Sequence, residues 1–135
     1  MIKVNVVKEI NYPIKSSNIK KVLTDFLKEK NIKKKVEVNV SVVSLETMND
    51  LGKRYLKEKG NREHNVLSFT ASESKEKFVE APDDVTRLGE IVICFPVLKE
   101  EAKDEGLSID EKVKELVLHG ALHLLGVHHD WFKYY

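Results

Sequence analysis

The sequence predicts an α+β fold in which a small mixed sheet of about four strands packs against helices. Two observations support this fold class. The chain has 135 residues, enough for one domain, which we expect over residues 1–135, to bury a core without disulfide support. Four strand-like segments alternate with helix-like segments, which is typical of α+β or mixed-sheet domains.

The first 55 residues predict two strands and two helices. Ile2–Val6 alternates apolar and polar residues, as a half-buried strand does. Ser16 or Ser17 is expected to cap the helix that follows. The valines of Val36–Val42 alternate strictly with polar residues and predict the clearest strand. Ser44 is expected to cap a second helix, whose apolar positions are Leu45, Met48, Leu51 and Tyr55.

Two further strands flank an acidic segment. Val66–Phe69 predicts a short strand, and the more continuously apolar Leu88–Phe95 predicts a strand covered on both faces. The only cysteine, Cys94, lies in this second strand and is expected to pack as a small hydrophobe. The polar segment Thr70–Arg87 between them is expected to run over the surface.

The C-terminal part predicts two helices. Pro96 suits the start of a short helix. Ser108 and Glu111 form a capping box for a last helix over Ile109–Leu125, which is apolar around most of its circumference. Such a helix is buried.

Composition excludes some classes of protein. Every apolar run is far too short to span a membrane, and no signal-peptide pattern begins the chain. We therefore expect a cytoplasmic protein without a membrane partner. The net charge of +1 says little about partners, but the basic residues between Lys53 and Arg62 are candidates for phosphate contacts.

Four of the five histidines lie within eleven residues at the end of the last predicted helix. His119 and His123 are four apart on the one polar stripe of that helix, so their rings can bind one divalent ion. Gly126 offers a left-handed helix end, after which His128 or His129 could supply a third ligand. Three imidazoles leave a coordination position open for water, as in catalytic zinc sites.

Gly120 stands directly after His119. Helical zinc peptidases with the motif His-Glu-x-x-His carry their general base at this position. The missing carboxylate argues against an ordinary metallopeptidase.

Three stretches of the chain carry a family resemblance. The segment from His119 to His129, with the pattern His-Gly-x-Leu-His-Leu-x-Gly-x-x-His, resembles the signature of the YbeY family, bacterial zinc-dependent endoribonucleases of rRNA maturation. Asn65–Phe69 and Leu88–Val92 resemble that family's Thr-Asp-Val-Leu-Ser-Phe and Leu-Gly-Asp-Ile strands. The similarity extends from Met1 to Asp130.

The resemblance implies that His119, His123 and His129 hold one Zn²⁺ ion at the end of the last helix. Ni²⁺ and Cu²⁺ also bind such imidazole sets tightly. The resemblance further implies hydrolysis of single-stranded RNA in rRNA maturation and ribosome quality control. The small ribosomal subunit is then an expected partner, and DNA is not.

Several other residues are candidates for catalytic roles. The family's Tyr-Arg element resembles Tyr55-Leu56 here, so Arg54 or Lys57 could contact RNA. Ser68 on the short strand could orient substrate or a ligand ring. The general base stays open between metal hydroxide, His128 and the RNA 2′-hydroxyl.

Two alternative functions also stay open. One is a zinc hydrolase of peptide or amide substrates, in which the segment Thr70–Arg87 brings in the missing carboxylate. The other is a non-catalytic, ribosome-associated factor with a structural zinc site.

Overall fold

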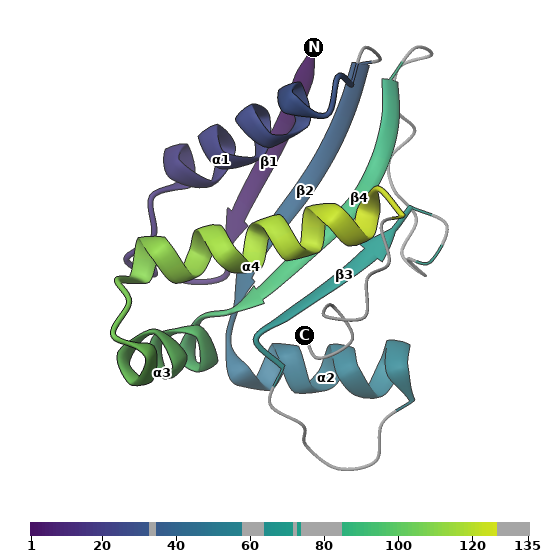
Figure 1. The fold of residues 1–135 in the computed structure, drawn as a ribbon. Helices are drawn as coiled ribbons and strands as arrows, with labels where there is room; N and C mark the ends of the chain where they lie inside the picture. The colour runs from purple at the N-terminus through teal and green to yellow at the C-terminus, as the bar shows by residue number, and fades with distance from the viewer. Residues whose placement is uncertain (33–34, 58–63, 72, 74–84, 127–135) are drawn as a thin grey trace.

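The computed structural model describes residues 1–32, 35–57, 64–71, 73 and 85–126. Within them the chain forms, in order, β1 (Ile2–Lys8), α1 (Ser16–Glu29), β2 (Lys35–Val43), α2 (Leu45–Leu56), β3 (Val66–Thr70), β4 (Val85–Cys94), α3 (Phe95–Glu105) and α4 (Ile109–Leu124). The strands form one sheet in the order β1-β2-β4-β3 (Figure 1). Strands β1, β2 and β4 are parallel and β3 is antiparallel to β4. The predicted α+β fold with a small mixed sheet is therefore confirmed.

The main core lies between the sheet and the helices α1 and α4, which run across one face of the sheet (Figure 1). The parallel pair β1 and β2 requires a crossover, which α1 supplies. Alternate residues of β2 point into this core, and they are at most 3% exposed: Val36, Val38, Val40 and Val42. The alternation in the sequence thus marks the face of β2 that α1 and α4 cover.

A second, smaller core lies between α2 and the other face of the sheet. Val92 and Cys94 of β4 pack there with Met48 of α2 and Phe69 of β3. Because Ile91 and Ile93 of β4 belong to the main core, this strand is covered on both faces, as its continuous apolar pattern predicted. Cys94 is buried as expected.

The predicted helix caps have different outcomes. The Ser44 side chain accepts a hydrogen bond from the backbone N–H of Thr47 at 3.2 Å. Ser108 and Glu111 form both bonds of the capping box, each 3.0 Å long. The cap predicted for α1 is wrong, because Ser16 is already the first residue of the helix and the N-cap, Lys15, makes no side-chain cap bond.

The strand β4 begins earlier than the sequence predicted. Val85–Arg87, which the sequence predicts to lie in the surface segment, instead extend β4 and pair with Lys35–Glu37 of β2. The side chains of Arg87 and Glu37 form an ion pair with 3.7 Å between Nη2 and Oε1. At the other end of the predicted surface segment, Thr70 belongs to β3 because it pairs with Gly89 of β4. Residues 72 and 74–84 of that segment lie outside the described residues.

Candidate active site

Helix α4 carries the predicted metal ligands, and its close contact with β4 fixes how it lies. Gly120 is buried, and a Cβ atom at this position would lie only 2.9 Å from Cγ2 of Ile91. The absence of a side chain therefore lets α4 rest directly on β4. His119 and His123 lie on the flank of this helix, one turn apart, as predicted.

The surroundings of His119 favour its neutral form. The ring is half-buried, and its Nδ1 atom is fully enclosed. Burial lowers the pKa of His119 below 6.5, the nearby Glu115 carboxylate raises it, and Lys112 lowers it, with a net lowering. Neutral imidazole is the form that binds metal ions, so the side chain fits the predicted role.

His123 contacts a carboxylate from another part of the chain. Its Nε2 atom lies 3.4 Å from Oε1 of Glu73, and the His123 side chain is 28% exposed. Glu73 also accepts hydrogen bonds of 2.9 Å from the backbone N–H and the hydroxyl of Thr70. The backbone bond from Thr70 is the largest cause that lowers the pKa of Glu73. The sequence indicated only that this segment could bring in a carboxylate, and it did not identify Glu73.

The third predicted ligand lies outside the described residues, as does His128. Gly126 has the predicted left-handed conformation, with φ of 77°. Across the part of the chain that the structure describes, no group of three or more His, Cys, Asp or Glu side chains could hold a metal ion. The choice of His129 as third ligand therefore stays a prediction. The donor set described in α4, two imidazoles one turn apart, suits a divalent transition metal.

Ser68 and Arg54, two of the candidate catalytic residues, lie on different faces of the sheet. Ser68 of β3 pairs with Ile91 and lies two residues from Val66, which belongs to the core under α4. Since alternate strand residues share a face, Ser68 lies on the face that α4 covers. Arg54 lies in the last turn of α2, on the opposite face, where it forms an ion pair with Asp50 at 3.4 Å.

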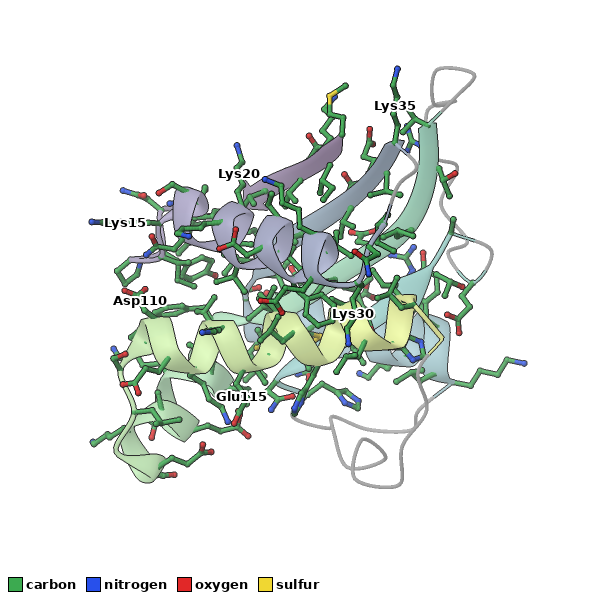
Figure 2. All side chains as sticks on the ribbon, turned by 45° about the horizontal axis from the view of Figure 1, so that its top comes forward. Lys15, Lys20, Lys30, Lys35, Asp110 and Glu115 are labelled. Atoms are coloured by element: carbon green, nitrogen blue, oxygen red, sulfur yellow. The ribbon has the colours of Figure 1, made fainter. Side chains whose placement is uncertain are left out.

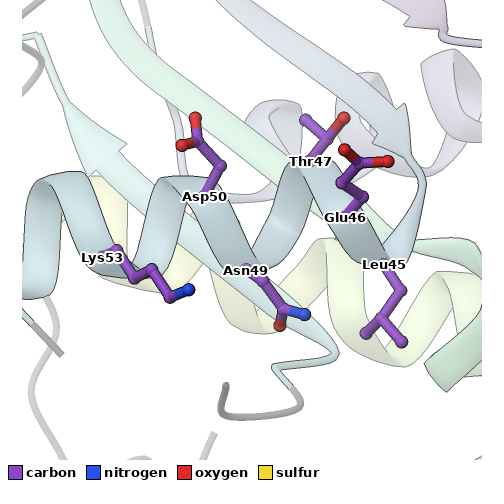
Figure 3. Close-up of a pocket in the computed structure, with 6 residues that line it drawn as sticks. All are labelled: Leu45, Glu46, Thr47, Asn49, Asp50 and Lys53. Carbon is purple, nitrogen blue, oxygen red and sulfur yellow. The ribbon is translucent and has the colours of Figure 1, made fainter. Parts of the chain in front are cut away.

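The basic segment between Lys53 and Arg62 is described only in part, because residues 58–63 lie outside the described ranges. Lys53 and Arg54 are exposed on α2. A hollow of about 620 Å³ runs along this helix (Figure 3), and its described lining residues are Leu45, Glu46, Thr47, Asn49, Asp50 and Lys53. This lining carries two carboxylates and one lysine, so its charge does not favour a phosphate.

The N-terminal part of the polar stripe on α4 has a structural role. The Lys112 side chain is only 5% exposed, and its Nζ atom lies 3.0 Å from Glu105 of α3 and 2.5 Å from Glu115. Figure 2 shows Glu115 on the flank of α4 nearest α3. Burial lowers the pKa of Lys112 and the carboxylates raise it, with a net increase. These contacts connect α3 to α4. Lys112 and Glu115 are engaged in them, and His119 and His123 are the residues of the polar stripe that could bind a metal ion.

Comparisons with known proteins agree with the fold and with the motifs. Residues 4–132 match the family model described as Endoribonuclease YbeY. The protein named Endoribonuclease YbeY from Acinetobacter baumannii is 33% identical over 117 residues, which is 87% of this chain and 72% of the relative. The protein of the same name from Staphylococcus carnosus is 35% identical over 111 residues, which is 82% of this chain and 71% of the relative. A solution structure of a protein from Thermotoga maritima is 27% identical in sequence and superposes with a TM-score of 0.61. The match covers 95% of this chain and 75% of the Thermotoga chain.

The family match and these relatives identify a protein of the endoribonuclease class, and its fold is α+β with a mixed four-stranded sheet. The chain belongs to the YbeY family, as the three sequence motifs predicted. Among the described helices, none is both long and apolar enough to cross a membrane.

Proposed function

We propose that this protein is a zinc-dependent endoribonuclease that cleaves single-stranded RNA in rRNA maturation and ribosome quality control. The proposal includes a cytoplasmic location and the small ribosomal subunit as partner. The observation that carries it is the pair His119 and His123, one turn apart on the flank of α4 in a chain of the YbeY family. Membership in a family of endoribonucleases supports RNA as the substrate.

The metal would be held by His119, His123 and His129. When bound, the ion would polarise a phosphate oxygen and lower the pKa of a coordinated water. The chain's own residues would prepare the site. Burial lowers the pKa of His119 and so favours the neutral form that binds metal. Ser68, which lies on the sheet face under α4, would orient substrate or a ligand ring.

The basic residues from Lys53 onward would attract the RNA backbone, with Arg54 as the individual candidate contact. Arg54 is exposed at the end of α2, where a phosphate could replace Asp50 as its partner. The choice between metal hydroxide, His128 and the RNA 2′-hydroxyl stays open: the first two would act as general base, and the 2′-hydroxyl would be the attacking group that loses its proton.

A peptide or amide hydrolase is less well supported. The position after His119, where such enzymes carry their base, faces the core and contacts Ile91. A glutamate side chain does not fit there. The family match also names RNA cleavage and no peptide substrate.

The decisive experiment combines metal analysis with digests. His119→Ala and His129→Ala should each lose bound zinc and the cleavage of labelled single-stranded RNA, while His64→Ala, a histidine outside the predicted site, should retain both. A casein digest in parallel tests the peptidase alternative. The proposal fails if His119→Ala keeps normal metal content and cleavage, or if cleavage survives rigorous chelation. A structural zinc site would instead give a lower Tm on chelation, with RNA binding retained and no cleavage at any stage.

A further inference from the structure

We propose that the hollow between α1 and α4 is a subsite for one nucleobase of a single-stranded RNA, beside the helix that carries the histidines. The inference rests on the proposed function, because it takes single-stranded RNA as the substrate. It does not depend on a metal ion, and it assigns a role to a surface outside the histidine motif.

The hollow lies between two helices that run side by side in broadly the same direction over the main core (Figure 1). Its volume is about 420 Å³, and it lies alongside the second half of α1. Its apolar lining residues are half-buried: Val22, Phe26 and Leu118. Val22 and Phe26 also pack against the main core, so the fold itself sets the apolar floor of the hollow.

The rim of the hollow is polar, and its described residues carry no net charge. Lys21 and Asp25 line it as an ion pair of 2.8 Å. Lys114 and Glu29 add a second ammonium group and a second carboxylate. This balance does not favour a phosphate. It suits a nucleobase, which has an apolar face and an edge of hydrogen-bond donors and acceptors.

Phe26 gives the floor an aromatic ring on which a base can stack. The Nζ atom of Lys30 lies 5.5 Å from the centroid of this ring, so one face of the ring is within reach of groups at the surface. Proteins that bind single strands stack bases on such rings and hold the phosphates with nearby cations. Lys28 and Lys30 are exposed at the end of α1, where they can contact the phosphates of the bound nucleotide.

The charges along the two helices favour one end of the hollow for the RNA backbone. A smaller hollow of about 270 Å³ continues towards the start of both helices, and its lining includes Asp110 and Glu111. Figure 2 shows Asp110 at this end of α4. These carboxylates repel phosphates, whereas Lys28 and Lys30 attract them at the opposite end.

The favoured end is also the one closer to the histidines. Leu118, which lines the hollow, directly precedes His119 on α4. Successive residues of a helix are about 100° apart around its axis, so these two side chains point to adjacent flanks of α4. A single strand with one base in the hollow can therefore cross α4 and present a neighbouring linkage to the histidines.

The test compares a short single-stranded RNA with an abasic oligonucleotide that has the same number of phosphates. Both carry phosphorothioate linkages that resist cleavage, and fluorescence anisotropy with the full-length protein gives each Kd. Phe26→Leu keeps the apolar floor but removes the ring. We expect it to raise the Kd for RNA by about 5- to 150-fold, as loss of one base–aromatic stack does, and to leave the Kd for the abasic oligonucleotide unchanged. Phe26→Trp should bind RNA as the parent does.

A matched pair of lysine variants tests the rim of the hollow. Lys114 and Lys99 are both exposed on helices, but Lys99 of α3 is not among the lining residues. Only Lys114→Ala should raise the Kd for RNA. Methyl NMR of the parent is an independent readout, in which the signals of Val22 and Leu118 should shift with RNA and not with the abasic oligonucleotide.

The inference is overturned if Phe26→Leu binds RNA as tightly as the parent. It is also overturned if the methyl signals of Val22 and Leu118 stay unshifted at saturating RNA, which would leave the hollow to a protein partner, or if the abasic oligonucleotide shifts them equally. With a parent that still cleaves single-stranded RNA, these results refute only this inference. If the parent neither binds nor cleaves single-stranded RNA, the proposed function fails as well.

Discussion

Replacing Gly89 with alanine would introduce a methyl group where β3, β4 and α4 meet. Gly89 has φ of +146°, a conformation that residues with side chains rarely adopt. An added Cβ atom would lie 2.1 Å from the carbonyl oxygen of Phe69, 2.8 Å from Leu124 and 2.9 Å from Thr70. Two of these three contacts are with backbone atoms, which cannot rotate away as the end of a side chain can.

The expected loss of stability has two parts. A strained backbone conformation costs about 1–3 kcal/mol, and forced overpacking costs about 1–3 kcal/mol more. We therefore expect Gly89→Ala to lower the free energy of unfolding by about 2–6 kcal/mol, a large share of the roughly 5–15 kcal/mol typical of a domain. Gly106→Ala is the matched control. It has φ of +69° and nothing within 4 Å of the added atom, so only the left-handed backbone cost of about 1–2 kcal/mol applies.

Urea denaturation of the two variants and the parent measures this difference. At equal slope m, the midpoint of Gly89→Ala should fall well below that of Gly106→Ala. Equal midpoints would refute the argument that the close approach of Phe69, Thr70 and Leu124 sets the cost. A change of slope would show instead that the variant alters how compact the folded or unfolded state is.

Three further predictions concern stability. Ser108→Ala should lower the free energy of unfolding by about 1 kcal/mol, measured by urea denaturation. Ser16→Ala should leave it almost unchanged, because the Ser16 side chain does not cap the helix. Lys112→Met should lower the free energy of unfolding by about 1–3 kcal/mol. The reason is that three partly exposed carboxylates, those of Glu101, Glu105 and Glu115, lose their buried cation. An unchanged urea midpoint would contradict this expectation. The hydrogen bond from Thr47 lowers the pKa of Glu9 below 4.5, so its stabilising effect is present above that pH and is lost as the pH falls through the folded-state pKa. Glu9→Gln should therefore flatten the acid side of a stability–pH curve.

Most elements were predictable because their signals are local. The alternating valines of β2 identify its buried face whatever the strand pairs with. The capping box at Ser108 was predictable because Glu111 stands three residues later, at the position that completes the box. Ser16 has Ile19 at the corresponding position and lacks that reciprocal partner. A serine before an apolar stripe was too weak a signal for a cap.

The errors and gaps come from interactions between distant parts of the chain. Val85–Arg87 are too polar to indicate a strand alone, and they become one because β2 extends beside them. The histidine pair was predictable from a spacing of four on one helix. Glu73 was not, because it lies fifty residues from His123 in a segment with several other carboxylates, Glu76, Glu80, Asp83 and Asp84. Its position beside His123 depends on Thr70 at the end of β3, whose backbone N–H and hydroxyl bind its carboxylate.

The packing of α4 also limits where acid–base groups of the site can come from. In a His-Glu-x-x-His helix the residue after the first histidine must reach the reacting water. Here that residue is Gly120, which contacts Ile91, a side chain with no exposed surface. A carboxylate at this position would be buried against the sheet at a high desolvation cost. The orientation of α4 on β4 thus excludes a base from position 120. Two other described carboxylates lie near the histidines: Glu115, one turn before His119 on α4, and Glu73, three residues after the end of β3, beside His123.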